Sequence, residues 1–193
     1  MSPEHHKYKG TIVYRGDAIR DEHYQHVLFE DTATTPTALA ALNLTLWWGC
    51  MTVLSCADCI QAYLQCDLDD STWVILPYKL WLEPWKKMYD KTEKLSVKLV
   101  RSLYGHPLAG NLWQQHLEKV VKTLGGEPVP SYPSNLVFRQ HTLLLNIYVD
   151  DCTLAGGTVE VQRRFWEELR QKVKLEPEDF ISENGTKILG RLH

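Results

Sequence analysis

The sequence predicts an α+β fold in which an antiparallel sheet carries helices packed on one face. Two apolar runs of strand length, 143–149 and 152–155, flank a turn at Asp150-Asp151. Apolar residues also recur every four positions in one later segment, as expected for an amphipathic helix: Val161, Phe165, Leu169 and Val173. Hairpins and helices alternate along the chain, which is typical of helices layered on an antiparallel sheet.

Strands are predicted where apolar or β-branched residues run between turn residues. The first, 8–15, ends at the turn Gly16-Asp17, and the second, 51–57, leads into Asp58. The others are predicted at 73–77, 135–139, 143–149, 152–155 and 186–192.

Helices are predicted from capping residues and helical spacing. Thr35 caps a helix whose first position is Pro36 and which ends at Gly49. A short helix is expected around Ala62, Tyr63 and Leu64. Two longer helices are expected, from Pro107 to Gly125-Gly126 and after Gly156-Gly157-Thr158, whereas 81–87, rich in Trp, Pro and Lys, is expected to be a loop.

Composition and charge limit the class of protein. The 193 residues fit one domain, or one domain with a subdomain, and no apolar run is long enough to cross a membrane. An odd count of five cysteines favours a reducing compartment over a disulfide framework. The formal net charge of -3 counts against a protein that grips nucleic acid, yet seven cations lie between Lys79 and Arg101. That run is either a solvated face or a strip that binds a nucleic-acid backbone.

Three aspartates form the strongest candidate for a catalytic site. Asp150 and Asp151 follow the apolar strand 143–149, and adjacent carboxylates repel each other unless a cation lies between them. Asp58 also ends an apolar strand, so the two strand ends can converge in one sheet. Three carboxylates could hold two magnesium ions, which would activate a primer 3′-hydroxyl and stabilise a leaving pyrophosphate. An isolated Asp-Asp pair is more often an ordinary turn.

Five stretches, in this order along the chain, resemble the reverse transcriptases of copia-type LTR retrotransposons. They are Tyr8-Lys9 to Arg15-Gly16, Asp58 to Leu68, Lys98 to Trp113, Tyr148-Val149-Asp150-Asp151 and Ile188-Leu189-Gly190. The resemblance implies the fingers and palm of a Pol polyprotein, with partial fingers and the first palm helix in 1–50 and the palm in 51–193. No thumb, ribonuclease H or integrase region is expected.

The resemblance implies a role for several residues. Asp58, Asp150 and Asp151 would be catalytic and bind two Mg²⁺ ions, with Mn²⁺ as an alternative. Nucleotide binding would involve the main-chain carbonyl of Cys59, the ring of Tyr63 against the deoxyribose, the cations Lys9 and Arg15 at the triphosphate, and Gly110, which with Gly105 and Ala109 allows close approach. Tyr63 could instead only pack its helix, and Lys9 and Arg15 could be ordinary exposed strand residues.

The resemblance therefore implies an RNA-directed DNA polymerase that uses deoxynucleoside triphosphates. Its expected partners are an RNA or DNA template-primer and the rest of the Pol polyprotein, with no membrane. The expected location is the cytoplasm, including virus-like particles, with the nucleus left open. Thr11, Leu108 and Asn111 depart from the family pattern, which favours the alternative of a catalytically silent or truncated remnant that binds nucleic acid.

Three other interpretations rank lower. A zinc site would use Cys56 and Cys59 with further cysteines or histidines, but no second Cys-x-x-Cys pair exists. A Cys-His hydrolase would need a cysteine with a lowered pKa. Base stacking by tryptophan is expected, if anywhere, at Trp81 and Trp85 in the basic segment.

Overall fold

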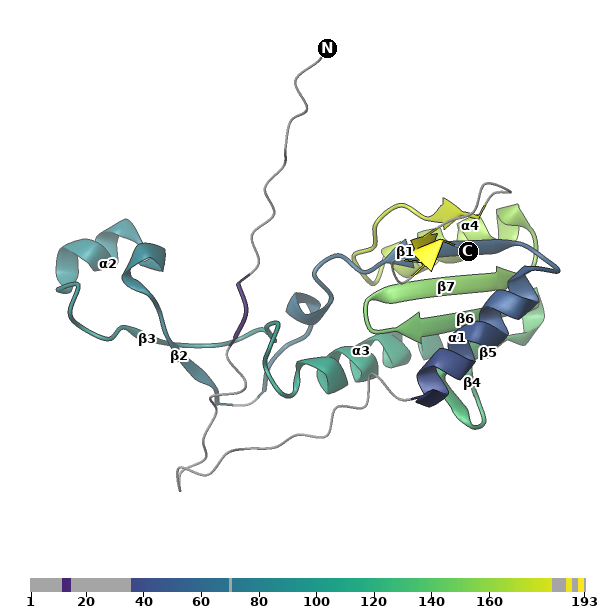
Figure 1. Ribbon diagram of the computed structural model, residues 1–193. Coiled ribbons are helices and arrows are strands. Elements are labelled where there is room, and N and C mark those ends of the chain that lie inside the picture. The colour runs from purple at the N-terminus through teal and green to yellow at the C-terminus, as the bar shows by residue number, and fades with distance from the viewer. Residues whose placement is uncertain (1–11, 15–35, 70, 182–186, 189–190, 193) are drawn as a thin grey trace, which may run out of the picture.

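Six strands form one antiparallel sheet with the order β4-β5-β6-β7-β1-β8. The computed structural model describes residues 12–14, 36–69, 71–181, 187–188 and 191–192 (Figure 1). The strands of the sheet are β1 (Leu54–Asp58), β4 (Glu127–Val129), β5 (Tyr132–Phe138), β6 (Leu143–Tyr148), β7 (Asp151–Gly156) and β8 (Asp179–Phe180). The predicted α+β class is confirmed. Within the described residues, no helix has the length and apolar character needed to span a bilayer.

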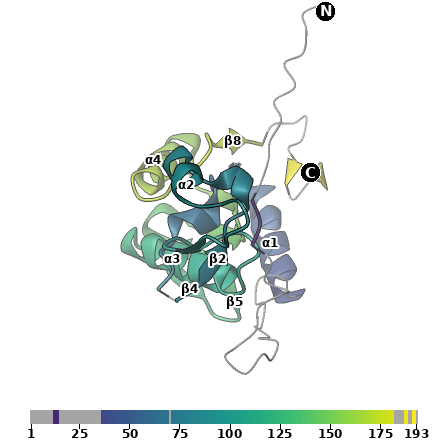
Figure 2. The ribbon, with the colours of Figure 1, turned by 90° about the vertical axis from the view of Figure 1, so that its left-hand side faces the viewer.

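Helices cover both faces of this sheet. Helices α3 (Ala109–Thr123) and α4 (Val159–Arg170) lie on one face, and α1 (Pro36–Gly49) crosses β5, β6 and β7 on the other (Figure 2). The sequence predicted helices on one face only, whereas α1 lies on the opposite face from α3 and α4. Pro36 and Gly49 bound α1 as predicted, and the predicted short helix is the 3₁₀ turn η2 (Ala62–Gln65).

Strand alternation assigns each face its residues. In β6, Leu143 and Leu145 belong to the core between the sheet and α3 and α4, while Asn146 points toward α1 and is also fully buried. Asn146 donates to Asn135 Oδ1 at 2.6 Å, and Asn135 donates to the Ala41 carbonyl of α1 at 3.0 Å. A buried amide is costly unless it is hydrogen-bonded, so this pair fixes where α1 sits on the sheet.

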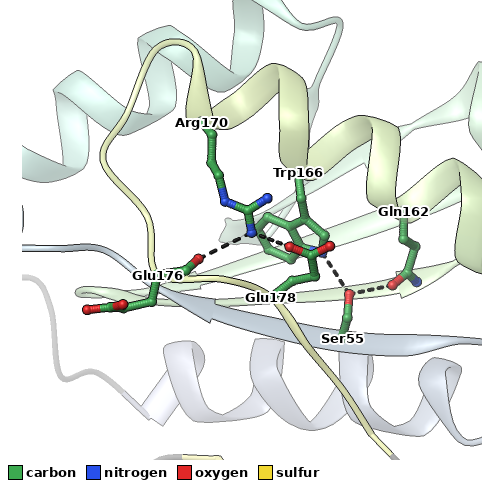
Figure 3. Close-up of polar contacts among 6 residues, drawn as sticks. All are labelled: Ser55, Gln162, Trp166, Arg170, Glu176 and Glu178. Carbon is green, nitrogen blue, oxygen red and sulfur yellow. Dashed lines mark hydrogen bonds and ion pairs between the residues drawn. The ribbon is translucent and has the colours of Figure 1, made fainter.

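A buried polar network attaches α4 to the sheet (Figure 3). Gln162 donates to the carbonyl oxygens of Val53 at 2.9 Å and Gly156 at 2.8 Å, and it accepts a hydrogen bond from Ser55. Trp166 donates its indole N–H to the Ser55 hydroxyl at 2.8 Å. The network fixes α4 relative to β1, the strand that ends at Asp58.

Strands β2 (Trp73–Ile75) and β3 (Ser96–Lys98) form a separate ribbon that projects from the body with helix α2 (Glu83–Met88) (Figure 1). The loop predicted over 81–87 is therefore wrong. Pro84 lies in the first turn of α2, where proline is tolerated because that turn leaves its N–H groups unbonded anyway.

Both ends of the chain differ from the simple strand predictions. Residues 12–14, the described part of the strand predicted over 8–15, form no regular secondary structure, although the Tyr14 N–H donates to the Tyr104 carbonyl at 2.6 Å. The strand predicted over 186–192 is instead a pair of short antiparallel strands, β9 (Lys187–Ile188) and β10 (Arg191–Leu192).

We predict that Gly156→Ala destabilises the fold by about 2–4 kcal/mol, since a left-handed alanine is strained and also meets the backbone. Gly156 has φ +102°, and a Cβ there would lie 2.1 Å from the Thr142 carbonyl oxygen. The matched control is Gly125→Ala, at φ +91° with no atom within 4 Å of the added Cβ, which should cost about 1 kcal/mol. Urea unfolding measures both, and equal losses would contradict the steric argument.

Candidate functional site

Two of the predicted aspartates face each other across neighbouring strands. Strand β1 pairs with β7 in a register that sets Asp58 opposite Asp151. Asp150 lies in the two-residue turn between β6 and β7, next to Asp151. The structure therefore brings together carboxylates that are more than ninety positions apart in the chain. They lie at one end of the sheet, and α1 contacts the same sheet over β5 to β7.

The Asp151 carboxyl group holds its proton more tightly than a free aspartate. Its pKa rises from 3.8 to about 7, first through burial, then through a side-chain hydrogen bond with Asp58 and the charges of Asp58 and Asp150. When no cation is present, Asp151 therefore keeps its proton to a higher pH than a free aspartate does. A divalent cation would replace that proton, because it relieves the same repulsion with more charge.

The turn that carries Asp150 is held from two directions. Val149 has φ 58°, a left-handed conformation that is strained for a β-branched residue. Its carbonyl accepts the indole N–H of Trp113 from α3 at 2.6 Å. The Asp150 carbonyl accepts the Cys59 N–H at 2.8 Å, so the turn is also bonded to the end of β1. Such a strained conformation persists only where its surroundings over-determine it, as they do here.

The rings of two tyrosines pack against each other near the carboxylates. The rings of Tyr63, in η2, and Tyr104 lie 4.7 Å apart between centroids at an interplanar angle of 57°. The pKa of Tyr104 is raised by burial and then by the charge of Asp150, which places this ring near the turn. Tyr63 is half-buried and packs against the core, so its packing role is present whatever else it does.

The other predicted nucleotide-binding residues lie in different parts of the chain. Gly110 lies in the first turn of α3, and a Cβ added there would meet nothing within 4 Å, so open space surrounds this position. Lys9 and Arg15 lie outside the described residues. Cys59 is buried at the end of β1, and its sulfur lies 3.8 Å from that of Cys152.

The Cys56 and Cys66 thiols are poor nucleophiles. Burial, followed by the charges of Asp179, Asp58 and Asp151, raises the pKa of Cys56 to about 11. Burial also raises the pKa of Cys66 to about 11. A cysteine hydrolase needs the opposite shift, so these two residues do not support that interpretation.

Trp81 cannot serve as a base-stacking platform. Its side chain is buried, and its indole N–H donates to the Leu76 carbonyl at 2.9 Å. The sequence interpretation of Trp81 is wrong, because tertiary packing of the projecting ribbon encloses it. Trp85 is half-buried in α2, and the exposed tryptophan of the ribbon is Trp73.

Two residues of the site were missed by the sequence interpretation. One is Trp113, whose hydrogen bond to the Val149 carbonyl has no sequence signal because it joins α3 to a turn thirty-six residues away. Tyr104 lies within one of the five copia-like stretches, but no role was expected of it.

The site can offer a hard cation two close carboxylates from β1 and β7, with a third on the adjoining turn. Oxygen ligands of this kind suit magnesium, which commonly takes one or two carboxylates and fills its remaining positions with water and phosphate. Within the described residues, no three His, Cys, Asp or Glu side chains lie close enough together to hold a metal ion, and this includes the three aspartates as a set. Ligands from a substrate would have to complete the coordination.

We predict that, in metal-free buffer, Asp151→Asn is more stable than the unmodified protein at pH 8 and about equally stable at pH 4. The folded state binds the Asp151 proton more tightly than the unfolded chain, so stability is lost as pH rises toward about 7. After allowance for the partial exposure of this group, the difference should be about 1–2 kcal/mol.

Urea unfolding at both pH values measures this difference, with Asp69→Asn as a control at an exposed carboxylate. A variant with no advantage at pH 8 would contradict the raised pKa of Asp151.

Comparison with known families identifies the chain. A family model described as reverse transcriptase (RNA-dependent DNA polymerase) matches residues 3–184. This range includes the three aspartates and the helices and strands that position them. No curated protein matches the chain. The chain belongs to the reverse transcriptase (RNA-dependent DNA polymerase) family.

Proposed function

We propose that the chain is the polymerase core of a copia-type retrotransposon, joining deoxynucleotides from their triphosphates to a primer 3′-hydroxyl. The observation that carries this proposal is the register of β1 and β7, which sets Asp58 opposite Asp151. The order of the five copia-like stretches along the chain supports the finer assignment within the family.

The proposed metal ligands are Asp58, Asp150 and Asp151. Two Mg²⁺ ions, or Mn²⁺, would when bound supply an activated primer hydroxyl and neutralise charge on the leaving pyrophosphate. The protein's own contribution is to hold Asp58 and Asp151 on two paired strands and Asp150 on a braced turn, so that little rearrangement is needed on substrate binding. The half-buried Asp151 and its raised pKa fit this role, because a carboxyl group that repels its neighbours gains most from a cation.

The nucleotide-binding roles remain as the resemblance implies them. Tyr63, paired with Tyr104 near Asp150, would lie under the deoxyribose and disfavour a 2′-hydroxyl. The open space at Gly110 would admit the nucleotide or the template-primer at the start of α3. The Cys59 carbonyl would bind metal, and Lys9 and Arg15 would bind the triphosphate.

An RNA or DNA template-primer is the proposed partner, together with the remaining parts of a Pol polyprotein. The projecting ribbon with α2 carries most of the cations between Lys79 and Arg101, and Trp73 on it is 62% exposed. Cations beside an exposed aromatic ring suit a strand whose phosphates and bases both need partners. A cytoplasmic setting, including virus-like particles, follows from the same proposal.

A second candidate is a catalytically silent remnant that keeps the fold and binds nucleic acid. It is favoured by Leu108 and Asn111, which stand at the start of α3 where the family has polar and basic residues. An activity assay separates the two candidates.

We predict that the protein extends a primer on an RNA template with deoxynucleoside triphosphates and Mg²⁺, and that Asp150→Asn lowers the rate by about a thousandfold or more. Asp69→Asn is the matched control, since it makes the same chemical change at an exposed position outside the turn. Circular dichroism checks that each variant is folded.

Extension that survives Asp150→Asn would overturn the metal mechanism. A folded protein that binds template-primer but never extends it would favour the silent remnant.

A further inference from the structure

A basic cavity lies among the helices, and none of the three aspartates is in its lining. Its volume is about 430 Å³, and it opens between η2, the middle of α3 and the end of α4. The lining contains four cations and no carboxylate: Arg101, Arg170, Lys172 and Lys174. The whole chain carries a formal charge of -3, so this concentration of positive charge does not follow from composition.

One glutamine gives the cavity a rigid frame. The Gln65 side chain donates to the Ile60 carbonyl at 2.8 Å and accepts the Lys174 N–H at 2.8 Å. The Gln65 carbonyl accepts the Arg101 guanidinium at 3.1 Å. Gln65 therefore connects η2 to two of the cationic segments, and a preformed frame lowers the entropy lost when a ligand binds.

The charges in the cavity are only half neutralised. Arg101 pairs with Asp67 at 3.0 Å, and Arg170 pairs with Glu178 and donates to the Glu176 carbonyl (Figure 3). Lys172 and Lys174 are exposed, and neither forms an ion pair within the described residues. Four positive and two negative groups leave two positive charges, supplied by the lysines.

A second hollow, on α3, differs from this cavity in its charge. It has a similar volume, about 460 Å³, and is lined by Lys119 and Lys122, but Glu118 is also in its lining and pairs with Lys122 at 2.7 Å. With two lysines and one glutamate, that hollow keeps one net positive charge, whereas the cavity beside η2 keeps two.

We infer that the cavity beside η2 binds a compact, phosphate-rich anion of the pyrophosphate or nucleoside-polyphosphate class. Three of its cations, Arg170, Lys172 and Lys174, lie on the segment that ends α4, and Arg101 from the segment before α3 joins them in the lining. Cations gathered around one volume fit clustered negative charge better than a row of single phosphodiesters. Arginine forks and lysine ammonium groups are the usual protein partners of phosphate, and the His116 ring adds a polar nitrogen to the lining. The inference does not use the carboxylates and so does not rest on the proposed polymerase chemistry.

Calorimetric titration of pyrophosphate into the full chain, in metal-depleted buffer, tests this site. Lys172→Gln together with Lys174→Gln should weaken binding by about tenfold or more, because two charge-assisted contacts are lost. Lys172→Arg together with Lys174→Arg should keep it. Lys119→Gln together with Lys122→Gln removes as many lysines from the hollow on α3 and should change binding by less than about twofold.

The same titration with other variants and another ligand locates the bound anion. Asp150→Asn should not weaken pyrophosphate binding, and a loss there would place the anion at the carboxylates and overturn the inference. The inference would also be overturned if pyrophosphate did not bind to the unmodified protein. It would be overturned as well if the two lysines bound single-stranded oligothymidylate but not pyrophosphate. If the double glutamine variant fails to fold, Lys172→Gln and Lys174→Gln tested singly should each weaken binding by about threefold.

Discussion

The antiparallel pairing of β1 with β7 is the constraint on which the rest of the site depends. It sets Asp58 against Asp151, and a slip of one residue would turn one of the two carboxylates to the other face of the sheet. The pairing is costly at its polar end, where like charges meet, as the raised pKa of Asp151 reflects. The apolar end offsets that cost, since Ala57, Cys152 and Leu154 from the same two strands are buried in the core.

The helices act on the site through the backbone. Trp113 of α3 bonds the Val149 carbonyl, and the Cys59 N–H bonds the Asp150 carbonyl, so the strained turn is held on both sides of Asp150. Earlier along the chain, Gln162 of α4 donates to the Val53 carbonyl, and Trp166 of α4 donates to the Ser55 hydroxyl in β1, the strand that ends at Asp58. These contacts hold the backbone that carries the carboxylates.

Local sequence patterns could predict the strands of the site but not its bracing. Apolar runs that end at Asp58 and Asp150 predict two strand ends, because burial requires each run to lie within the sheet. The strained turn at Val149 and its bond to Trp113 could not be predicted, since they depend on how α3 crosses the sheet. The expected loop over 81–87 failed because Pro84 can begin a helix as well as end one, and the burial of Trp81 depends on contacts that only folding creates.

Binding of Mn²⁺, followed by the loss of its free electron paramagnetic resonance signal, tests most directly whether β1 and β7 together build one cation site. Asp58→Asn and Asp151→Asn should each weaken binding by about tenfold or more, because each removes one of two facing carboxylates. Asp69→Asn should leave it unchanged. If Asp151→Asn abolished binding while Asp58→Asn had no effect, the two strands would not share a cation, and the central claim would be contradicted.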